Sequence, residues 1–213
     1  MKKTLLFAFL LFTATHLSAQ ERPDGFSKRA ISDALFERID GKSYKEGCTL
    51  PLSELEYLEV LHYDAYGEVQ HGEIICNRAI SDDLLDIFQA LFEAHYPIER
   101  IRLVDDYDAD DERSMSANNT SCFNYRPVSG TATLSVHSRG MAIDINPLYN
   151  PYVKTVSGRQ HVEPAAGKPY VDRSRTFPYK IDRTDLCYKL FIAHGFRWGG
   201  AWRSCKDYQH FEK

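Results

Sequence analysis

Residues 135–144 read Ser-Val-His-Ser-Arg-Gly-Met-Ala-Ile-Asp, and residues 198–211 read Trp-Gly-Gly-Ala-Trp-Arg-Ser-Cys-Lys-Asp-Tyr-Gln-His-Phe. Between them they offer two histidines and two aspartates, of which His137, Asp144 and His210 would make a set of three metal ligands. A catalytic zinc ion typically takes three such protein ligands and keeps its fourth position open. The two stretches therefore predict one metal site, although each spacing taken singly is common in proteins.

The path of the chain between His137 and Asp144 must bend for this prediction to hold. The two residues are seven positions apart, so a straight strand would point their side chains to opposite faces. Gly140 lies between them and can adopt the conformations that such a bend needs. Asp144 is also flanked by Ile143 and Ile145, and a carboxylate in an apolar run is costly to bury unless a cation compensates it.

A second carboxylate lies close to the last candidate ligand. Asp207 precedes His210 by three residues, and a turn of this length would bring its side chain beside the metal. There it could take a proton from the attacking water and later deliver it to the leaving amine. Trp198 and Trp202 are, by default, aromatic residues of the core or of a pocket wall.

The order of these motifs is specific. Ser-x-His-x-x-Gly-x-Ala-x-Asp, then Trp-Gly-Gly-x-Trp, then Asp-x-x-His-Phe resembles the M15 zinc peptidases. These are the D-alanyl-D-alanine carboxypeptidases, dipeptidases and phage L-alanyl-D-glutamate peptidases of the hedgehog/DD-peptidase fold. The resemblance covers roughly residues 84–212. It implies one zinc ion per chain, held by His137, Asp144 and His210, with Asp207 as the catalytic acidic residue.

The same resemblance extends to a segment upstream of the first motif. Asn124-Tyr125-Arg126-Pro127 looks like the Tyr-Arg-Pro segment of the family. It implies that Arg126 stabilises the charged oxygen of the tetrahedral intermediate or orients the substrate carbonyl, which a permanently charged guanidinium does well. The alternative for Arg126 is a surface salt bridge. Ser135 is a further candidate for substrate binding.

The N-terminus has the features of an export signal. Lys2 and Lys3 precede an apolar run from Leu5 to Phe12, and Leu17-Ser18-Ala19 supplies small residues for cleavage. We therefore predict a signal peptide over residues 1–19 and a periplasmic or extracellular protein. The apolar run is too short for a permanent membrane span. With 26 basic and 30 acidic residues, the chain has no electrostatic case for binding nucleic acid.

The remaining residues, 20–213, predict a single α+β domain with an N-terminal extension over about 20–55. The resemblance implies a hedgehog/DD-peptidase-like arrangement, with a small and mainly antiparallel sheet, flanking helices and one zinc site. The expected elements follow in chain order: a polar lead-in with one short helix over 20–50, a hairpin of strands 57–63 and 69–76, a helix capped by Ser81 and stopped by Pro97, a strand over 98–104, a solvated acidic loop over 105–112, a strand over 141–145, a loop over 147–180 and a helix over 184–194.

The five cysteines are compatible with a disulfide in an exported protein. Cys122 and Cys205 each lie close in sequence to one of the two motifs. A Cys122–Cys205 bridge is therefore one hypothesis among several connectivities.

These features together predict an exported zinc metallopeptidase that hydrolyses peptidoglycan stem peptides, with D-alanyl-D-alanine carboxypeptidase activity first. The alternatives are an L-alanyl-D-glutamate-type endopeptidase and a non-catalytic, zinc-stabilised binding module. Asp207 argues against the last, because a structural site has no use for a spare carboxylate beside an open position. The sequence contains no Ser-x-x-Lys motif, which disfavours a serine penicillin-binding mechanism, and no His-Glu-x-x-His motif, which excludes the thermolysin-type zinc peptidases. The ligand set would also accept manganese or cobalt.

Overall fold

The computed structural model describes residues 23–213, so the expected signal peptide lies outside the described residues. This part of the chain combines helices and strands, in agreement with the predicted α+β class. Its helices are α1 (Asp33–Ile39), α2 (Ser81–Glu93), α3 (Asp111–Ser116) and α4 (Leu186–Ala193). Its strands are β1 (Ser27–Ala30), β2 (Leu55–Tyr63), β3 (Val69–Asn77), β4 (Arg100–Ile101), β5 (Asn119–Thr120), β6 (Ala142–Asp144), β7 (Tyr152–Val156), β8 (Arg159–Glu163), β9 (Arg197–Trp198), β10 (Lys206–Asp207) and β11 (His210–Glu212).

The strands form several small sheets instead of the one sheet that was expected. Within residues 23–213 the orders are β1-β2-β3, β10-β7-β8 and β6-β11-β9, each antiparallel, beside a parallel β4–β5 pair. Outside the β2–β3 hairpin the strands are only two to five residues long. No helix in this described part is long and apolar enough to cross a bilayer.

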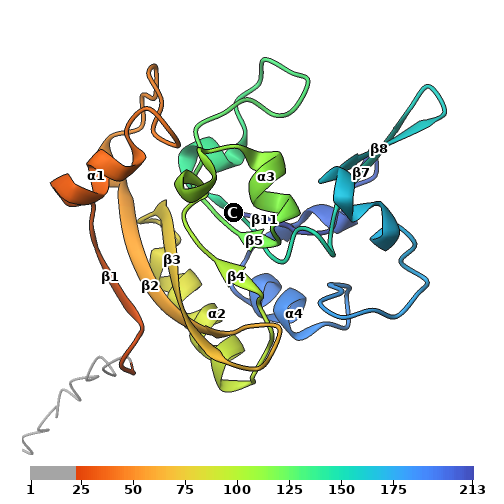
Figure 1. Ribbon diagram of the computed structural model, residues 1–213, viewed down its shortest axis with the longest axis horizontal. Coiled ribbons are helices and arrows are strands. Elements are labelled where there is room, and N and C mark those ends of the chain that lie inside the picture. Colours follow the sequence, from red (N-terminus) through yellow and green to blue (C-terminus); the bar gives the residue numbers. More distant parts are fainter. Residues whose placement is uncertain (1–22) are drawn as a thin grey trace, which may run out of the picture.

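The predicted hairpin is confirmed as β2 and β3, which pair from Leu55↔Asn77 to Tyr63↔Val69. Alternation of side chains along these strands gives the sheet two buried faces. One face, with Leu58 and Ile74, packs in the main core with α2 (Figure 1). The other face, with Tyr57, contacts the smaller core that contains the buried residues of α1.

The N-terminal segment is more regular than a polar lead-in. Strand β1 adds an edge to the hairpin by pairing with β2. Helix α1 begins after Ser32, whose hydroxyl accepts a hydrogen bond from the amide of Leu35. Leu35 and Ile39 are then buried in the smaller core, so this segment packs as part of the fold.

Both longer predicted helices are present, with different caps. Ser81 is the first residue of α2 and not its cap; its hydroxyl contacts Glu56 and the carbonyl of Arg78. Helix α2 ends before Pro97 as expected. Helix α4 is capped by Asp185, which accepts hydrogen bonds from two amides of the first turn, and Gly195 follows with a φ of +82°.

The prediction of an irregular loop over residues 147–180 is wrong. The segment contains the β7–β8 hairpin, which extends away from the rest of the chain in Figure 1, and the 3₁₀ helix η4 (Ala165–Tyr170). Arg173 ties it together by donating to the carbonyls of Tyr149 and Ile181 and to the side chain of Asn150. Its guanidinium also lies 4.4 Å from the ring centroid of Tyr208.

Two further expectations are corrected. The strand over 98–104 is reduced to β4, paired in parallel with β5. The acidic segment 105–112 is not uniformly solvated. Asp105 is buried and accepts hydrogen bonds from the amide and hydroxyl of Ser43. The carboxylate of Asp105 therefore anchors the N-terminal segment.

Candidate metal centre

Strand pairing brings two of the three candidate ligands together. His210 on β11 lies directly opposite Asp144 on β6 in the antiparallel register, and Phe211 lies opposite Ile143. Phe211 and Ile143 are completely buried in the main core, so the alternate positions face the other side of the small sheet. On that side His210 Nδ1 lies 3.1 Å from Asp144 Oδ1.

The third candidate, His137, reaches the same place from the 3₁₀ helix η3 (Val136–Arg139). The chain reverses after η3 at Gly140, where φ is +65°, as expected from the sequence. A Cβ at Gly140 would also lie 2.6 Å from the backbone nitrogen of Asn77, so this position requires glycine. His137 Nε2 lies 3.2 Å from Asp144 Oδ2 and 3.2 Å from His210 Nδ1.

The spacing of the donor atoms on these three side chains fits a tetrahedral zinc ion. Zinc–nitrogen bonds of 2.0–2.1 Å place neighbouring ligands of a tetrahedron about 3.3 Å apart. The two histidine nitrogens lie 3.2 Å apart, and each lies 3.1–3.2 Å from a different carboxylate oxygen of Asp144; all three side chains are buried. Among residues 23–213, these are the side chains that form a cluster able to hold a metal ion.

The electrostatics of the cluster also favour a cation. Burial alone would raise the pKa of Asp144, but His137 and His210 outweigh it and hold this pKa well below its usual range. Burial opposes the protonation of His210, yet hydrogen bonds with Asp144 and Glu212 raise its pKa to about 10. The carboxylates thus stabilise a positive charge in the cluster, and a bound metal ion can supply that charge in place of a proton on histidine.

Each imidazole has a partner on the ring nitrogen that faces away from the cluster. His137 Nδ1 lies 2.6 Å from the carbonyl oxygen of Cys122. His210 Nε2 lies 3.4 Å from Glu212 Oε2. Such partners fix the orientation of metal-binding histidines. Glu212 was missed from the sequence, although its position two residues after His210 on a strand places both on one face.

Asp207 lies next to the cluster because Gly199, which has no side chain, leaves room for it. A Cβ on Gly199 would be 2.7 Å from the Cβ of Asp207 and 3.3 Å from that of His210. Asp207 Oδ1 is buried and has no hydrogen-bond partner in the described residues. Burial raises the pKa of Asp207 to about 7, with Asp144 acting in the same direction and His210 against it. A carboxylate in this range is suited to exchanging protons near neutral pH.

In the Trp-Gly-Gly-x-Trp motif, the second glycine, Gly200, leaves room for the ring of the first tryptophan, Trp198. A Cβ on Gly200 would lie 2.3 Å from the ring of Trp198. The indole of Trp198 is buried and donates to the carbonyl of Tyr208. The ring of Trp202 lies 5.3 Å from that of His210, so it forms part of the wall around the cluster.

The structure places Arg126 beside the first motif. Its amide donates to the hydroxyl of Ser138, which in turn donates to the carbonyl of Arg126. Its guanidinium forms an ion pair with Asp111, and both side chains are partly exposed. This contact is the salt bridge that was considered as the alternative for Arg126. Ser135 is buried, and its hydroxyl accepts a hydrogen bond from the amide of His137, so it caps η3.

The hypothesis of a Cys122–Cys205 disulfide is wrong, because the described cysteines are all free thiols. Cys122 is buried in the main core, with its thiol 3.5 Å from the carbonyl of Gly140. Cys205 instead lies beside Tyr152 at the start of β7. Nearness in sequence to the two motifs therefore did not bring the two sulfur atoms together.

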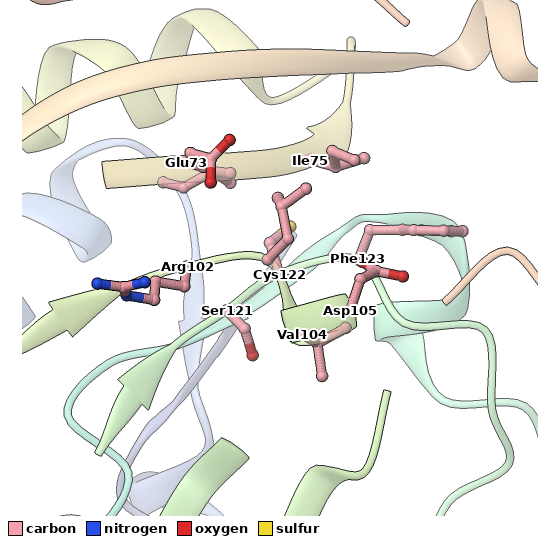
Figure 2. A pocket seen from close by; sticks show the side chains of 10 residues that line it. Glu73, Ile75, Arg102, Val104, Asp105, Ser121, Cys122 and Phe123 are labelled. Atoms are coloured by element: carbon pink, nitrogen blue, oxygen red, sulfur yellow. The ribbon is translucent and has the colours of Figure 1, made fainter. Parts of the chain in front are cut away.

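A small pocket is separate from the metal cluster. It lies between β3 and the segments around residues 102–105 and 121–123 (Figure 2). Its lining includes the side chains of Glu73, Arg102 and Cys122 but none of the cluster residues. The pocket therefore has no part in the candidate centre.

The comparisons with known proteins agree with the geometry. A family model of the M15 peptidases, described as D-alanyl-D-alanine carboxypeptidase, matches residues 129–213. The matched segment contains the whole metal cluster and Asp207, whereas Arg126 lies upstream of it. No curated protein and no solved structure matches the chain. Over residues 129–213, the match confirms the resemblance to the M15 peptidases that was predicted from the motifs.

Proposed function

We propose that this protein is an exported zinc peptidase that removes the terminal D-alanine from peptidoglycan stem peptides. The observation that carries the proposal is the buried cluster of His137, Asp144 and His210, with donor atoms 3.1–3.2 Å apart. This cluster falls inside the segment that matches the carboxypeptidase family. The proposed substrate lies outside the cytoplasm, which is consistent with the predicted signal peptide.

The chain's own residues divide the chemistry among them. His137, Asp144 and His210 would hold the ion, which when bound supplies a Lewis acid for the scissile carbonyl and lowers the pKa of water. Asp207 accepts the proton of the attacking water, because its carboxylate is buried beside the cluster with one oxygen free of hydrogen bonds. The same carboxyl group then donates that proton to the leaving amine.

Arg126 is the proposed positive group for the substrate. Its backbone is fixed to the turn that carries His137 through Ser138, while its guanidinium stays partly exposed in the pair with Asp111. A partly exposed guanidinium can exchange that partner for the negative oxygen that develops on the substrate. The capping hydrogen bond of Ser135 supports the same turn, so we propose that Ser135 acts on the substrate only through the position of His137.

Cleavage of defined muropeptides tests the proposal. Mature protein loaded with zinc is incubated with a pentapeptide stem that ends in D-alanyl-D-alanine, and products are identified by mass spectrometry. Loss of one D-alanine is the expected result, and Asp207→Asn should abolish it while zinc remains bound. Cleavage between L-alanine and D-glutamate would establish the endopeptidase alternative. A zinc-loaded protein that cleaves neither bond would overturn the peptidase proposal in favour of a binding module.

A further inference from the structure

Glu212 is a buried carboxylate next to the cluster with no assigned role. It is only 8% exposed and lies on β11, two residues after His210. Because side chains alternate along a strand, Glu212 and His210 project from the same face. Glu212 Oε2 lies 3.4 Å from His210 Nε2, on the side of the ring that faces away from Asp144 and His137.

The tautomer of His210 gives this contact its importance. Nδ1 is the ring nitrogen that faces Asp144 and His137, so Nδ1 must present its lone pair to a metal ion. In a neutral imidazole the proton then belongs on Nε2, which becomes a buried donor that requires an acceptor. Glu212 supplies that acceptor. With no acceptor at Nε2, the proton would be favoured on Nδ1, where it blocks metal binding.

The second oxygen of Glu212 is also held. Arg197 on β9 lies opposite Glu212 across the β9–β11 pair, and its guanidinium is 2.8 Å from Oε1. The carboxylate thus has one oxygen on His210 and the other on Arg197, which fixes its plane. The Arg197 side chain is 75% exposed, so we expect water to replace it at little cost.

The two histidines of the cluster differ in how their outer nitrogens are satisfied. The outer nitrogen of His137 meets the backbone carbonyl of Cys122, which no substitution removes. The outer nitrogen of His210 meets a side chain. A point substitution can therefore remove the acceptor of His210, whereas none can remove the acceptor of His137.

We propose that Glu212 is a positioning residue that holds His210 in the Nε2–H tautomer and so sets the zinc affinity of the cluster. The proposal rests on the proposed zinc site and adds a residue to it. Carboxylates in this position typically change metal affinity by about 10- to 100-fold when they are removed. Glu212 would act through His210 and without contact with the substrate.

Zinc affinity, measured by competition with a chelator, tests the role of Glu212 independently of catalysis. Glu212→Ala in the mature chain should weaken zinc binding by about 10- to 100-fold. Glu212→Gln should retain most of the affinity, because its amide oxygen can still accept the Nε2 proton. Arg197→Ala is the matched control and should stay within about threefold of wild type. Circular dichroism of the metal-free variants verifies that each one folds.

The outcomes separate this inference from the proposed function. A wild-type protein that binds no zinc would overturn both. A wild-type protein that binds zinc, with Glu212→Ala binding equally well, would overturn only the role of Glu212. Nitrogen-15 spectra of the zinc-loaded protein provide a second readout, in which His210 should carry its proton on Nε2. A proton on Nδ1 would contradict the inference.

Discussion

Replacing Gly199 by alanine should impair catalysis through a displacement whose size follows from the structure. The new Cβ would lie 2.7 Å from both the Cβ and the carbonyl oxygen of Asp207, at least about 0.7 Å short of ordinary contact at 3.4 Å. The contact involves backbone, so no flexible side chain can relieve it by rotation. Asp207 or the Gly199 turn must therefore move by most of that distance.

A displacement of this size has a predictable cost for an acid–base residue. A misplacement of 1 Å can cost about 100-fold in rate, so we expect kcat/KM of Gly199→Ala to fall about 10- to 100-fold. Forcing a methyl group into a packed site should also cost about 1–3 kcal/mol of stability. Zinc should still bind, because the new Cβ would be 3.3 Å from that of His210, a contact that a shift of a few tenths of an ångström relieves.

The assay combines muropeptide cleavage, zinc content and urea denaturation of the same preparations. Gly130→Ala is the control, since a Cβ there would meet nothing within 4 Å, and only its backbone φ of +71° opposes the substitution. It should lose stability through backbone strain and keep its activity. A Gly199→Ala variant with kcat/KM within about twofold of wild type would refute the idea that close packing at Gly199 positions Asp207.

Three further predictions concern the cluster and its surroundings. Asp207→Asn should retain stoichiometric zinc and lose at least about 100-fold in kcat, because an amide cannot act as a general base. Near-normal turnover in a steady-state assay would remove Asp207 from the mechanism. Arg126→Ala should lower kcat by about 100-fold or more if its guanidinium stabilises the oxyanion, and unchanged kcat and KM would leave it only the salt bridge with Asp111. In metal-free protein, His210 has its pKa raised from about 6.5 to about 10, so its stabilising contribution is complete below pH 6.5 and is lost as pH rises towards 10. Thermal melts of chelated protein should therefore show a decline in Tm over this window that is weaker in His210→Ala, and an equal decline in both would contradict the assigned cause.

The parts of the site that depend on local sequence could be predicted. The spacing of His137 and Asp144 required a bend, and Gly140 offered the backbone freedom for it. Asp144 within an apolar run indicated a buried carboxylate with a compensating partner. The β2–β3 hairpin was equally predictable, since alternation of apolar residues and a central glycine are local signals.

The parts of the fold and site that depend on pairing between distant segments could not be predicted from the sequence. The register that sets His210 opposite Asp144 joins residues that are 66 positions apart. Strand β7 also pairs with the two-residue strand β10 from another part of the chain, although its main partner β8 is local. Arg173, which holds the 147–180 segment through backbone carbonyls, leaves no pattern in sequence. The Cys122–Cys205 hypothesis failed for the same reason.

X-ray absorption at the zinc edge tests the central claim most directly. Mature protein loaded with one equivalent of zinc should show four nitrogen or oxygen neighbours at about 2.0–2.1 Å, with the outer-shell scattering of two imidazole rings. His210→Ala should lose one of these rings or fail to retain the metal. A sulfur neighbour at about 2.3 Å, or a spectrum without imidazole scattering, would show that the zinc is bound elsewhere and would contradict the proposed centre.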